Sequence, residues 1–169
     1  ESNGQIVVRA FLPYAQRVAI AEGDHALERI EGSDFFEWRG DASAVPQRYR
    51  LIWHDDRDHQ HIHHDPYCFP PQLGDMDLHL FGEGKHWHAY RFLGAREHTV
   101  DGVAGVLFSV WAPNAKRVSV VGDFNRWDGR VNPMRRRTGG VWELFIPNLD
   151  QGALYKFEIR NDAWDAVFS

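Results

Sequence analysis

The chain has 169 residues, of which 43% are hydrophobic and 25% charged, a balance typical of a globular protein. Its net charge of −5 argues against non-specific nucleic-acid binding, which needs a basic face, and no apolar run is long enough to span a membrane. A single cysteine, Cys68, excludes an intrachain disulfide, and no signal-peptide pattern is seen, so we expect a cytoplasmic location.

The first third of the chain predicts strands, because it contains short runs rich in Val, Ile, Phe, Trp and Tyr that partly alternate with polar residues. These runs are Gln5–Phe11, Arg17–Ala21, Phe35–Arg39 and Arg48–His54. Asp55 to Asp58 is the expected tip of a hairpin whose second arm is His59–His64. Several short strands separated by regular turn signals are typical of a β-sandwich.

The middle segment, 65–98, is predicted to be a packed linker. Three prolines within six residues stiffen its start. Trp87 to Leu93 is predicted to form a short helix closed by Gly94, since glycine favours a C-terminal cap. The segment is too apolar for a free tether, so we expect it to hold the two modules in a fixed relative orientation. The side chains expected to pack on the modules are Leu78, Leu80, Phe81, Trp87, Tyr90 and Phe92.

The last part of the chain repeats the first. RAFLPYAQRVAIAEG at 9–23 aligns with SVWAPNAKRVSVVGD at 109–123, which matches Pro13 with Pro113 and Ala15 with Ala115. Phe36-Glu37-Trp38 loosely matches Val141-Trp142-Glu143, and Tyr49-Arg50-Leu51 matches Tyr155-Lys156-Phe157. The strands expected here are Val106–Ala112, Arg117–Gly122, Val141–Ile146 and Tyr155–Ile159. Two copies so far apart indicate two domains of one type in series, and each proline should end a strand or lie on an edge strand.

Several motifs resemble the amino-terminal region of bacterial glycogen branching enzymes. They are FLGAREH at 92–98, FSVWAPNAKRVSVVGDFNRWDG at 108–129, GVWELFIPNL at 140–149 and GALYKFEI at 152–159. The linker sequences DPYCFPP at 65–71 and DLHLFGEGKHW at 77–87 resemble the same family. The resemblance is strong from Asp65 to Ile159 and weaker in the first module.

The resemblance implies an all-β fold of two tandem immunoglobulin-like (early-set) β-sandwiches. The expected divisions are a first module at 1–64, a linker with a short helix at 65–98, a module of the carbohydrate-binding module family 48 type at 99–162, and a tail at 163–169. In full-length branching enzymes a (β/α)8 barrel follows, which cuts an α-1,4-glucan chain and rejoins the piece through an α-1,6 bond.

No catalytic residue is expected in this chain. Retaining glycoside chemistry needs two carboxyl groups about 5–5.5 Å apart in one site, and no motif here would place two in that way. No cofactor is expected either.

Three residues are candidates for contact with α-glucan. Trp127 lies in the turn-rich stretch GDFNRWDG, where a tryptophan is poorly placed for a core and well placed to stack on a sugar ring. The resemblance implies that Lys156 matches a lysine that bonds sugar hydroxyls in related glycogen-binding modules, and that Trp164 lies near their second platform tryptophan, at a different spacing. The alternatives are that Trp127 packs over its own loop or against the barrel, and that Lys156 is a solvated edge-strand lysine.

Other conspicuous residues have structural interpretations. Asp123, Asn125 and Asp128 are expected to build their turn, because Asn and Asp bond their own backbone and tolerate left-handed conformations. The tryptophans within predicted strands are expected in the cores or in packing between the modules. These are Trp38, Trp53, Trp111 and Trp142.

Five histidines, at positions 54, 59, 61, 63 and 64, cluster in the predicted hairpin. His59, His61 and His63 would share one face of a strand and could converge on a metal. The pattern lacks a firm ligand spacing, so we expect a polar surface and no bound metal.

The leading functional hypothesis is a targeting region that holds α-glucan near the catalytic barrel, for which several weak contacts suffice. The rival hypothesis is a purely structural region that stabilises the barrel. A third is the corresponding region of a debranching or trehalose-forming enzyme, although the two-module arrangement and the linker DPYCFPP favour branching. The expected partners are α-glucan and the catalytic barrel, with no nucleic acid and no membrane.

Overall fold

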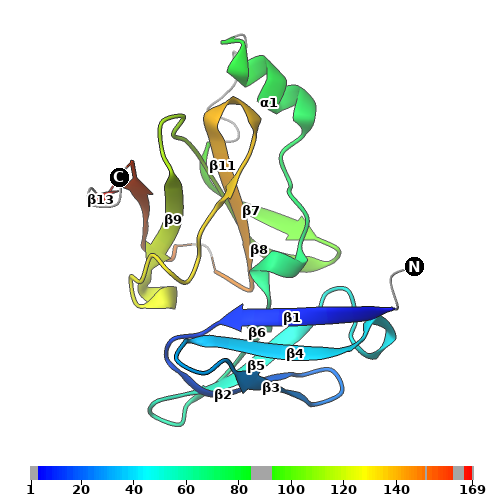
Figure 1. Ribbon diagram of the computed structural model, residues 1–169. Coiled ribbons are helices and arrows are strands. Elements are labelled where there is room, and N and C mark those ends of the chain that lie inside the picture. Colours follow the sequence, from blue (N-terminus) through cyan, green and yellow to red (C-terminus); the bar gives the residue numbers. More distant parts are fainter. Residues whose placement is uncertain (1–3, 85–92, 151, 162–165, 169) are drawn as a thin grey trace. The chain divides into compact units, whose positions relative to one another are not determined.

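The computed structural model describes residues 4–84, 93–150, 152–161 and 166–168. Contacts divide the chain into two compact units, Glu1–Phe69 and Pro70–Ser169 (Figure 1). Strands dominate both units, which confirms the predicted all-β class. No helix in the described part of the chain has the length and apolar character needed to cross a membrane.

The regular elements in the described part of the chain are short. The strands of the first unit are β1 (Gln5–Phe11), β2 (Ala15–Ile20), β3 (His25–Arg29), β4 (Phe35–Asp41), β5 (Arg50–Asp55) and β6 (Gln60–His64). Those of the second unit are β7 (Gly94–Val100), β8 (Val103–Trp111), β9 (Arg117–Gly122), β10 (Arg135–Arg136), β11 (Val141–Pro147), β12 (Tyr155–Arg160) and β13 (Ala166–Phe168). The α-helix is α1 (Asp75–Gly82), and the 3-10 turns are η1 (Ala42–Ala44), η2 (Pro66–Cys68), η4 (Asp123–Asn125) and η5 (Thr138–Gly140).

The first unit is built from one antiparallel sheet in the order β1-β4-β3-β2-β5-β6. β3 joins its two halves, because Glu28 and Arg29 pair with β4 while the preceding residues pair with β2. Strand alternation directs every second side chain inward, and both halves contribute to one core. The buried core residues are Val8, Ala10, Ala15, Val18, Ile20, Leu27, Phe36, Val45 and Leu51.

The second unit contains two antiparallel sheets, with the orders β10-β11-β8-β7 and β13-β12-β9. Its core combines residues of both sheets, which defines a β-sandwich. Phe108 of β8 is at its centre, with ring centroids 4.9 Å from Tyr155 and 6.4 Å from Phe157 of β12.

The internal repeat of the sequence is also a repeat of the fold. β1 pairs with β4 as β8 pairs with β11, and β2 pairs with β5 as β9 pairs with β12. The same turn follows β1 and β8: the Ala15 N–H donates to the Leu12 carbonyl at 3.1 Å, and the Ala115 N–H donates to the Ala112 carbonyl at 3.2 Å. Pro13 lies in the first of these turns, so the prediction that the matching prolines end strands is confirmed.

The register of the strands corrects the predicted alignment by one residue. Arg9 lies opposite Glu37, and its repeat partner Ser109 lies opposite Glu143. Glu37 therefore corresponds to Glu143 and not, as the loose sequence match suggested, to Trp142. The shift has a physical reason, because a slip of one residue would turn the buried face of a strand outward, and Trp142 is a core residue.

In the described residues, the helix α1 and four strands are not among the elements that the sequence predicts: β3, β7, β10 and β13. β3 and β7 are not predicted, because β3 buries only Leu27 and β7 only Val100. β7 begins within the segment predicted as linker, and the second unit already begins at Pro70. The helix expected from Trp87 to Leu93 lies, except for Leu93, outside the described residues.

The segment before and within α1 packs on the second sandwich. The buried Glu143 carboxylate accepts hydrogen bonds from the backbone N–H groups of Gln72 at 2.8 Å and Leu73 at 3.2 Å. Arg137 pairs with Glu143 and also donates to the Leu73 carbonyl at 3.2 Å. Leu78 of α1 is buried, as predicted.

The remaining linker predictions have mixed outcomes. Leu80 and Phe81 are partly buried, whereas Trp87, Tyr90 and Phe92 lie outside the described residues. The fixed relative orientation of the two modules stays a prediction.

Candidate functional site

The loop from Gly122 to Gly129 leaves β9 in an unusual backbone conformation. It begins with η4, and both Arg126 and Trp127 then adopt left-handed conformations, with φ of 54° and 59°. Such a conformation costs on the order of 1–3 kcal/mol for a non-glycine residue. The bonds within the loop must therefore hold it in place.

Asn125 is the central support of this loop. It is buried, and its side-chain oxygen accepts from the Gly122 N–H at 2.9 Å. Its side-chain nitrogen donates to the Val120 carbonyl at 2.8 Å and to Asn132 Oδ1 at 2.9 Å. These three bonds satisfy the buried side-chain amide and fix the turn. The turn-building role predicted for Asn125 is confirmed.

The two aspartates of the loop also have the predicted structural roles. Asp123 accepts a hydrogen bond from the indole of Trp127 at 2.8 Å. Asp128 accepts from the Arg130 backbone N–H at 2.9 Å and pairs with its guanidinium at 2.8 Å. Both side chains therefore serve the loop, as predicted.

Trp127 is held at two points and still keeps part of its surface open. Its backbone N–H donates to the Gly122 carbonyl at 2.9 Å, and its indole Nε1 donates to Asp123. The residue remains 40% exposed. The ring thus lies on its own loop and also presents a fixed aromatic surface to solvent.

Lys156 lies next to the strand end from which the loop departs. It is exposed and pairs with Val121 of β9, while the next pair in the ladder joins Tyr155 to Gly122. Tyr155 and Phe157 pack in the core, so alternation along β12 places Lys156 on the outer face. β13 pairs with β12 only from Glu158 onward.

The outer face beside Lys156 is covered by the rest of the same loop. Arg117 of β9 donates a hydrogen bond to the Gly129 carbonyl. Gly129 lies so close to the Glu158 carboxylate that a Cβ there would approach Oε1 to 2.3 Å. Ser119 lies on the outer face of β9, because it alternates with the core residues Val118 and Val120, and it is nevertheless fully buried. These contacts fix the end of the loop on the strands next to Lys156.

Three of the four tryptophans predicted to lie in strands and cores pack in a core. Trp142 is buried and donates to the Ala112 carbonyl at 3.0 Å, and Trp38 and Trp53 pack against the core of the first unit. These three predictions are confirmed. Trp164, the third candidate for glucan contact, lies outside the described residues.

The core assignment of Trp111 is wrong. Trp111 is 53% exposed, its Nε1 donates to the Gly139 carbonyl at 3.1 Å, and its ring meets Phe81 edge-on with centroids 5.8 Å apart. It is the last residue of β8, directly before the turn at Pro113, where the sheet no longer covers it. The Pro in Trp-Ala-Pro was the signal for this strand end.

The histidine-rich hairpin packs around an aromatic ring. His61 stacks on Trp53 with centroids 4.2 Å apart, and His63 meets the same ring edge-on. His61 and His59 approach one oxygen of Asp55, at 3.0 and 3.5 Å. The hydrogen bond with His61 and further bonds from backbone N–H groups hold the pKa of Asp55 well below its usual range, against burial, and burial lowers the pKa of His63 to about 4.

Metal binding by the histidines has no support in the geometry. Within the part of the chain that the structure describes, no group of three or more His, Cys, Asp or Glu side chains is arranged to hold a metal ion. His61 and His63 do share a face, but that face is occupied by Trp53.

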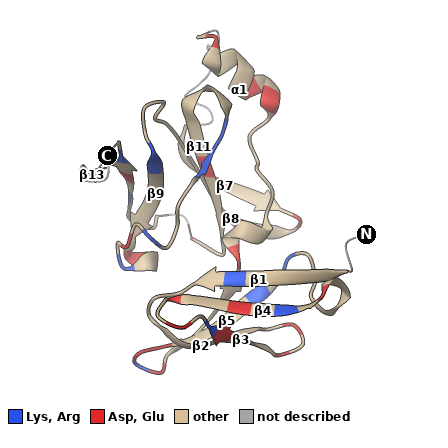
Figure 2. Ribbon diagram, in the orientation of Figure 1, with Lys and Arg blue, Asp and Glu red and all other residues tan. Residues whose placement is uncertain are grey.

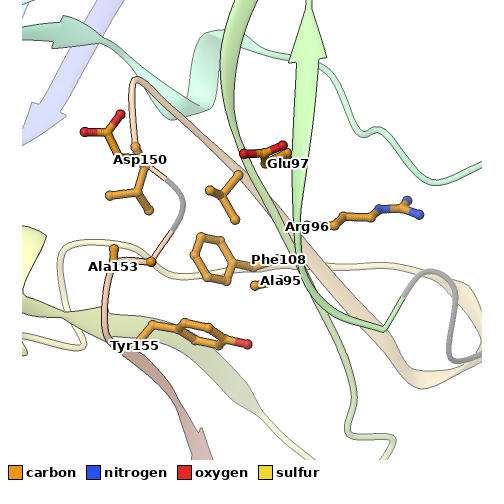
Figure 3. Close-up of a pocket in the computed structure, with 10 residues that line it drawn as sticks. Ala95, Arg96, Glu97, Phe108, Asp150, Ala153 and Tyr155 are labelled. Carbon is orange, nitrogen blue, oxygen red and sulfur yellow. The ribbon is translucent and has the colours of Figure 1, made fainter.

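A hollow of about 220 Å³ opens at one end of the second sandwich (Figure 3). The rings of Phe108 and Tyr155 line it together with Ala95, while Glu97 and Asp150 supply carboxylates. It is smaller than the roughly 300–1,000 Å³ typical of ligand pockets, and neither Trp127 nor Lys156 lines it. This hollow is therefore separate from the candidate residues Trp127 and Lys156.

Comparison with known families matches each unit separately. The family described as alpha-1,4-glucan branching enzyme GlgB, N-terminal domain, matches residues 1–67. The family described as Carbohydrate-binding module 48 (Isoamylase N-terminal domain) matches residues 92–167. Fold and matches together define two all-β modules, of which the second is a β-sandwich of the carbohydrate-binding type.

Close relatives specify the family further. The 1,4-alpha-glucan branching enzymes GlgB of Nitrosococcus oceani, Methylococcus capsulatus and Cellvibrio japonicus are 58%, 56% and 51% identical to this chain over 92%, 95% and 99% of its length. The chain belongs to the glycogen branching enzyme GlgB family, as its amino-terminal region. It spans only 21%, 22% and 24% of the length of these relatives. The match of the first unit favours branching over debranching or trehalose-forming enzymes.

A solved structure of type I pullulanase from Bacillus subtilis, complexed with maltose, is similar at a TM-score of 0.39 with 18% identity, over 98% of this chain and 22% of that one.

Proposed function

We propose that the second unit binds α-glucan on the surface formed by Trp127 and Lys156. The observation that carries the proposal is the exposed indole of Trp127, fixed by Asp123 and by the backbone of its own loop. Lys156 supplies a mobile donor on the neighbouring strand. An apolar ring with an adjacent polar group matches the two aspects of a glucose unit, which has a flat CH face and a rim of hydroxyls.

The expected affinity of such a site is modest. Covering an aromatic face of this size with CH groups contributes on the order of 1–3 kcal/mol. Several weak contacts along one polymer nevertheless give strong retention, because every contact after the first is intramolecular. A weak surface site is therefore sufficient for a region that keeps a polymer close to an enzyme.

We infer that the whole protein transfers α-1,4-glucan chains to α-1,6 positions, since its relatives are 1,4-alpha-glucan branching enzymes. The relatives are more than four times as long as the aligned region, and the catalytic barrel expected in the remaining length is the proposed intramolecular partner. A cytoplasmic location is part of this proposal and rests on the lone Cys68, which leaves this chain without an intrachain disulfide.

Affinity electrophoresis in gels containing glycogen tests the glucan-binding surface. We expect glycogen to slow the chain, and the retardation to be strongly reduced in Trp127→Ala and less reduced in Lys156→Ala. Trp111→Ala is a matched control, because Trp111 is also an exposed, hydrogen-bonded tryptophan of the same unit, and it should migrate as the unaltered chain does.

The purely structural hypothesis has its own supporting observation. Trp111 and Met76 are 53% and 70% exposed, and Phe81 lies against Trp111. An exposed apolar surface of this kind also suits a contact with another domain. If glycogen does not slow the unaltered chain, or slows Trp127→Ala equally, the structural hypothesis is favoured.

A further inference from the structure

The first unit contains a cleft of about 420 Å³ at the point where β3 changes its partner strand. β3 pairs with β4 only at Glu28–Glu37 and Arg29–Phe36, whereas β4 continues along β1 as far as Asp41. The strands therefore separate beyond Glu37. The cleft volume lies within the roughly 300–1,000 Å³ typical of small-molecule sites.

The charged side chains around the cleft are balanced in sign, and some of them are paired with one another. Glu37 accepts from Nε of Arg9 and from Nε of Arg39, each at 2.5 Å. Glu28 lies directly opposite Glu37, and the described residues give its carboxylate no hydrogen bond or ion pair. Figure 2 shows acidic and basic positions next to one another on β4. Arg29 also borders the cleft, but its guanidinium is bonded to Asp34 and to the Ala15 carbonyl. The two carboxylates are therefore balanced by Arg39 and by Arg9, which both donate to Glu37.

Trp38 adds an aromatic surface to this lining. Its ring lies over Gly40, where a Cβ would approach the indole to 2.2 Å, and against the imidazole of His25 with centroids 4.9 Å apart. The ring is thus fixed from two directions. Gly40 is required by this close approach of the indole.

Glu28 lies opposite a second carboxylate and takes no part in the ion pairs that compensate Glu37. Like charges directly opposite on neighbouring strands are destabilising. In the second unit the carboxylate that corresponds to Glu37 is Glu143, and it lies opposite Arg135. Glu37 is itself compensated by Arg9 and Arg39, so Glu28 is the carboxylate of this group that no ion pair of the described residues explains.

We propose that this cleft is a second α-glucan-binding site, with Glu28, Arg39 and Trp38 as its contact residues. The choice of ligand class rests on the proposed function of the second unit. A balanced lining does not select an ion, whereas carboxylate acceptors and guanidinium donors next to an aromatic ring suit the hydroxyls and the CH face of an uncharged sugar. The size of the cleft suits a short stretch of the polymer.

Titration with maltoheptaose, followed by NMR of the indole N–H groups, tests the cleft in the Trp127→Ala chain. We expect the Trp38 signal, assigned by its loss in Trp38→Phe, to move with added sugar. Glu28→Gln and Arg39→Ala should each weaken this response by about tenfold or more. Glu31→Gln makes the same charge change at an exposed turn residue and should not alter the response.

Stability provides a second measurement that separates binding from folding. Because the described residues give the Glu28 carboxylate no hydrogen bond or ion pair, Glu28→Gln should leave the melting temperature unchanged while binding is lost. The proposal is wrong if Trp38 does not respond to sugar, or if Glu28→Gln responds as the parent does. A Trp38 response without one from Trp127 in the unaltered chain would refute the proposed surface of the second unit alone, and the reverse would refute only the cleft.

Discussion

The indole of Trp127 donates its hydrogen bond to the carboxylate of Asp123 at 2.8 Å. The two residues are four positions apart in one loop, and the backbone N–H of Trp127 donates to Gly122, directly before Asp123. The exposed ring is therefore oriented by the residues that start its own loop. This arrangement limits the rotamer freedom that the side chain loses when a ligand binds.

Removal of the Asp123 carboxylate should weaken sugar binding more than it weakens the fold. In Asp123→Ala we expect the affinity for maltoheptaose to fall by about three- to tenfold, because the ring must be ordered on binding. The loss of this exposed hydrogen bond should cost no more than about 1 kcal/mol of unfolding free energy. Calorimetric titration measures the affinity, with Asp150→Ala as a control. Equal affinities in the parent chain, Asp123→Ala and Asp150→Ala would contradict the role of Asp123.

Asn125 should matter for stability, since its buried amide carries three hydrogen bonds. In Asn125→Ala we expect a loss of about 2–4 kcal/mol, because the partner groups at Gly122 and Val120 remain buried without it. Urea unfolding, followed at the amide signals of β9, measures the change. Asn125→Asp keeps the acceptor for the Gly122 N–H but turns a carboxylate oxygen towards two acceptor oxygens, so it should cost at least as much as Asn125→Ala. No difference between Asn125→Ala and the parent would refute this role.

The buried pair of Glu143 and Arg137 should be essential for the second unit. Arg137→Met leaves a carboxylate that is only 2% exposed without its cationic partner, and such losses cost about 3–5 kcal/mol. Arg136→Met is the control, because Arg136 is the exposed neighbour. Chemical unfolding of both variants decides the point, and similar stabilities would show that the backbone bonds of Glu143 suffice.

The first unit should lose stability in mildly acidic solution because of His63. Its pKa in the folded state is about 4, below the ordinary value of 6.5, as burial and then the neighbouring His61 and His64 disfavour its charge. As the pH falls from 6.5 to about 4, the unfolded chain therefore binds a proton that the folded chain does not. The loss is up to about 3 kcal/mol and levels off below pH 4.

Unfolding free energies at several pH values, followed at the amide signals of β5, measure this loss. His63→Asn should flatten the dependence between pH 6.5 and 4, whereas His79→Asn in the second unit should not. Asp55 has a lowered pKa, so its contribution is present above its unfolded pKa of about 3.9 and is lost only as the pH falls below that value. An unchanged slope in His63→Asn would contradict the assignment.

The sequence predicts the strands that bury alternate apolar side chains and misses those that do not. β1 and β9 are predicted at their observed bounds, because every second residue faces a core. β7 has a polar sequence and a single neighbour, β8, so its pairing depends on the rest of the sheet. The one-residue error at Glu143 arose where the two copies share few identical residues, and only the register of the ladder resolves it.

The candidate sites likewise include residues that local sequence patterns reveal and residues that only the tertiary structure reveals. Trp127 was visible as a tryptophan among turn residues, and Lys156 through a family resemblance. The exposure of Trp111 depends on the strand ending at that residue. The cleft of Glu28 and Trp38 depends on where β3 leaves β4, a tertiary feature that no local pattern of residues expresses.

The response of the seven tryptophan indole N–H signals to maltoheptaose in the unaltered chain is the most direct measurement of glucan recognition. The Trp127 signal, assigned by its absence in Trp127→Phe, should shift progressively and reach saturation, while the Trp111 signal stays in place. A stationary Trp127 signal at sugar concentrations that slow the chain in glycogen gels would contradict the account.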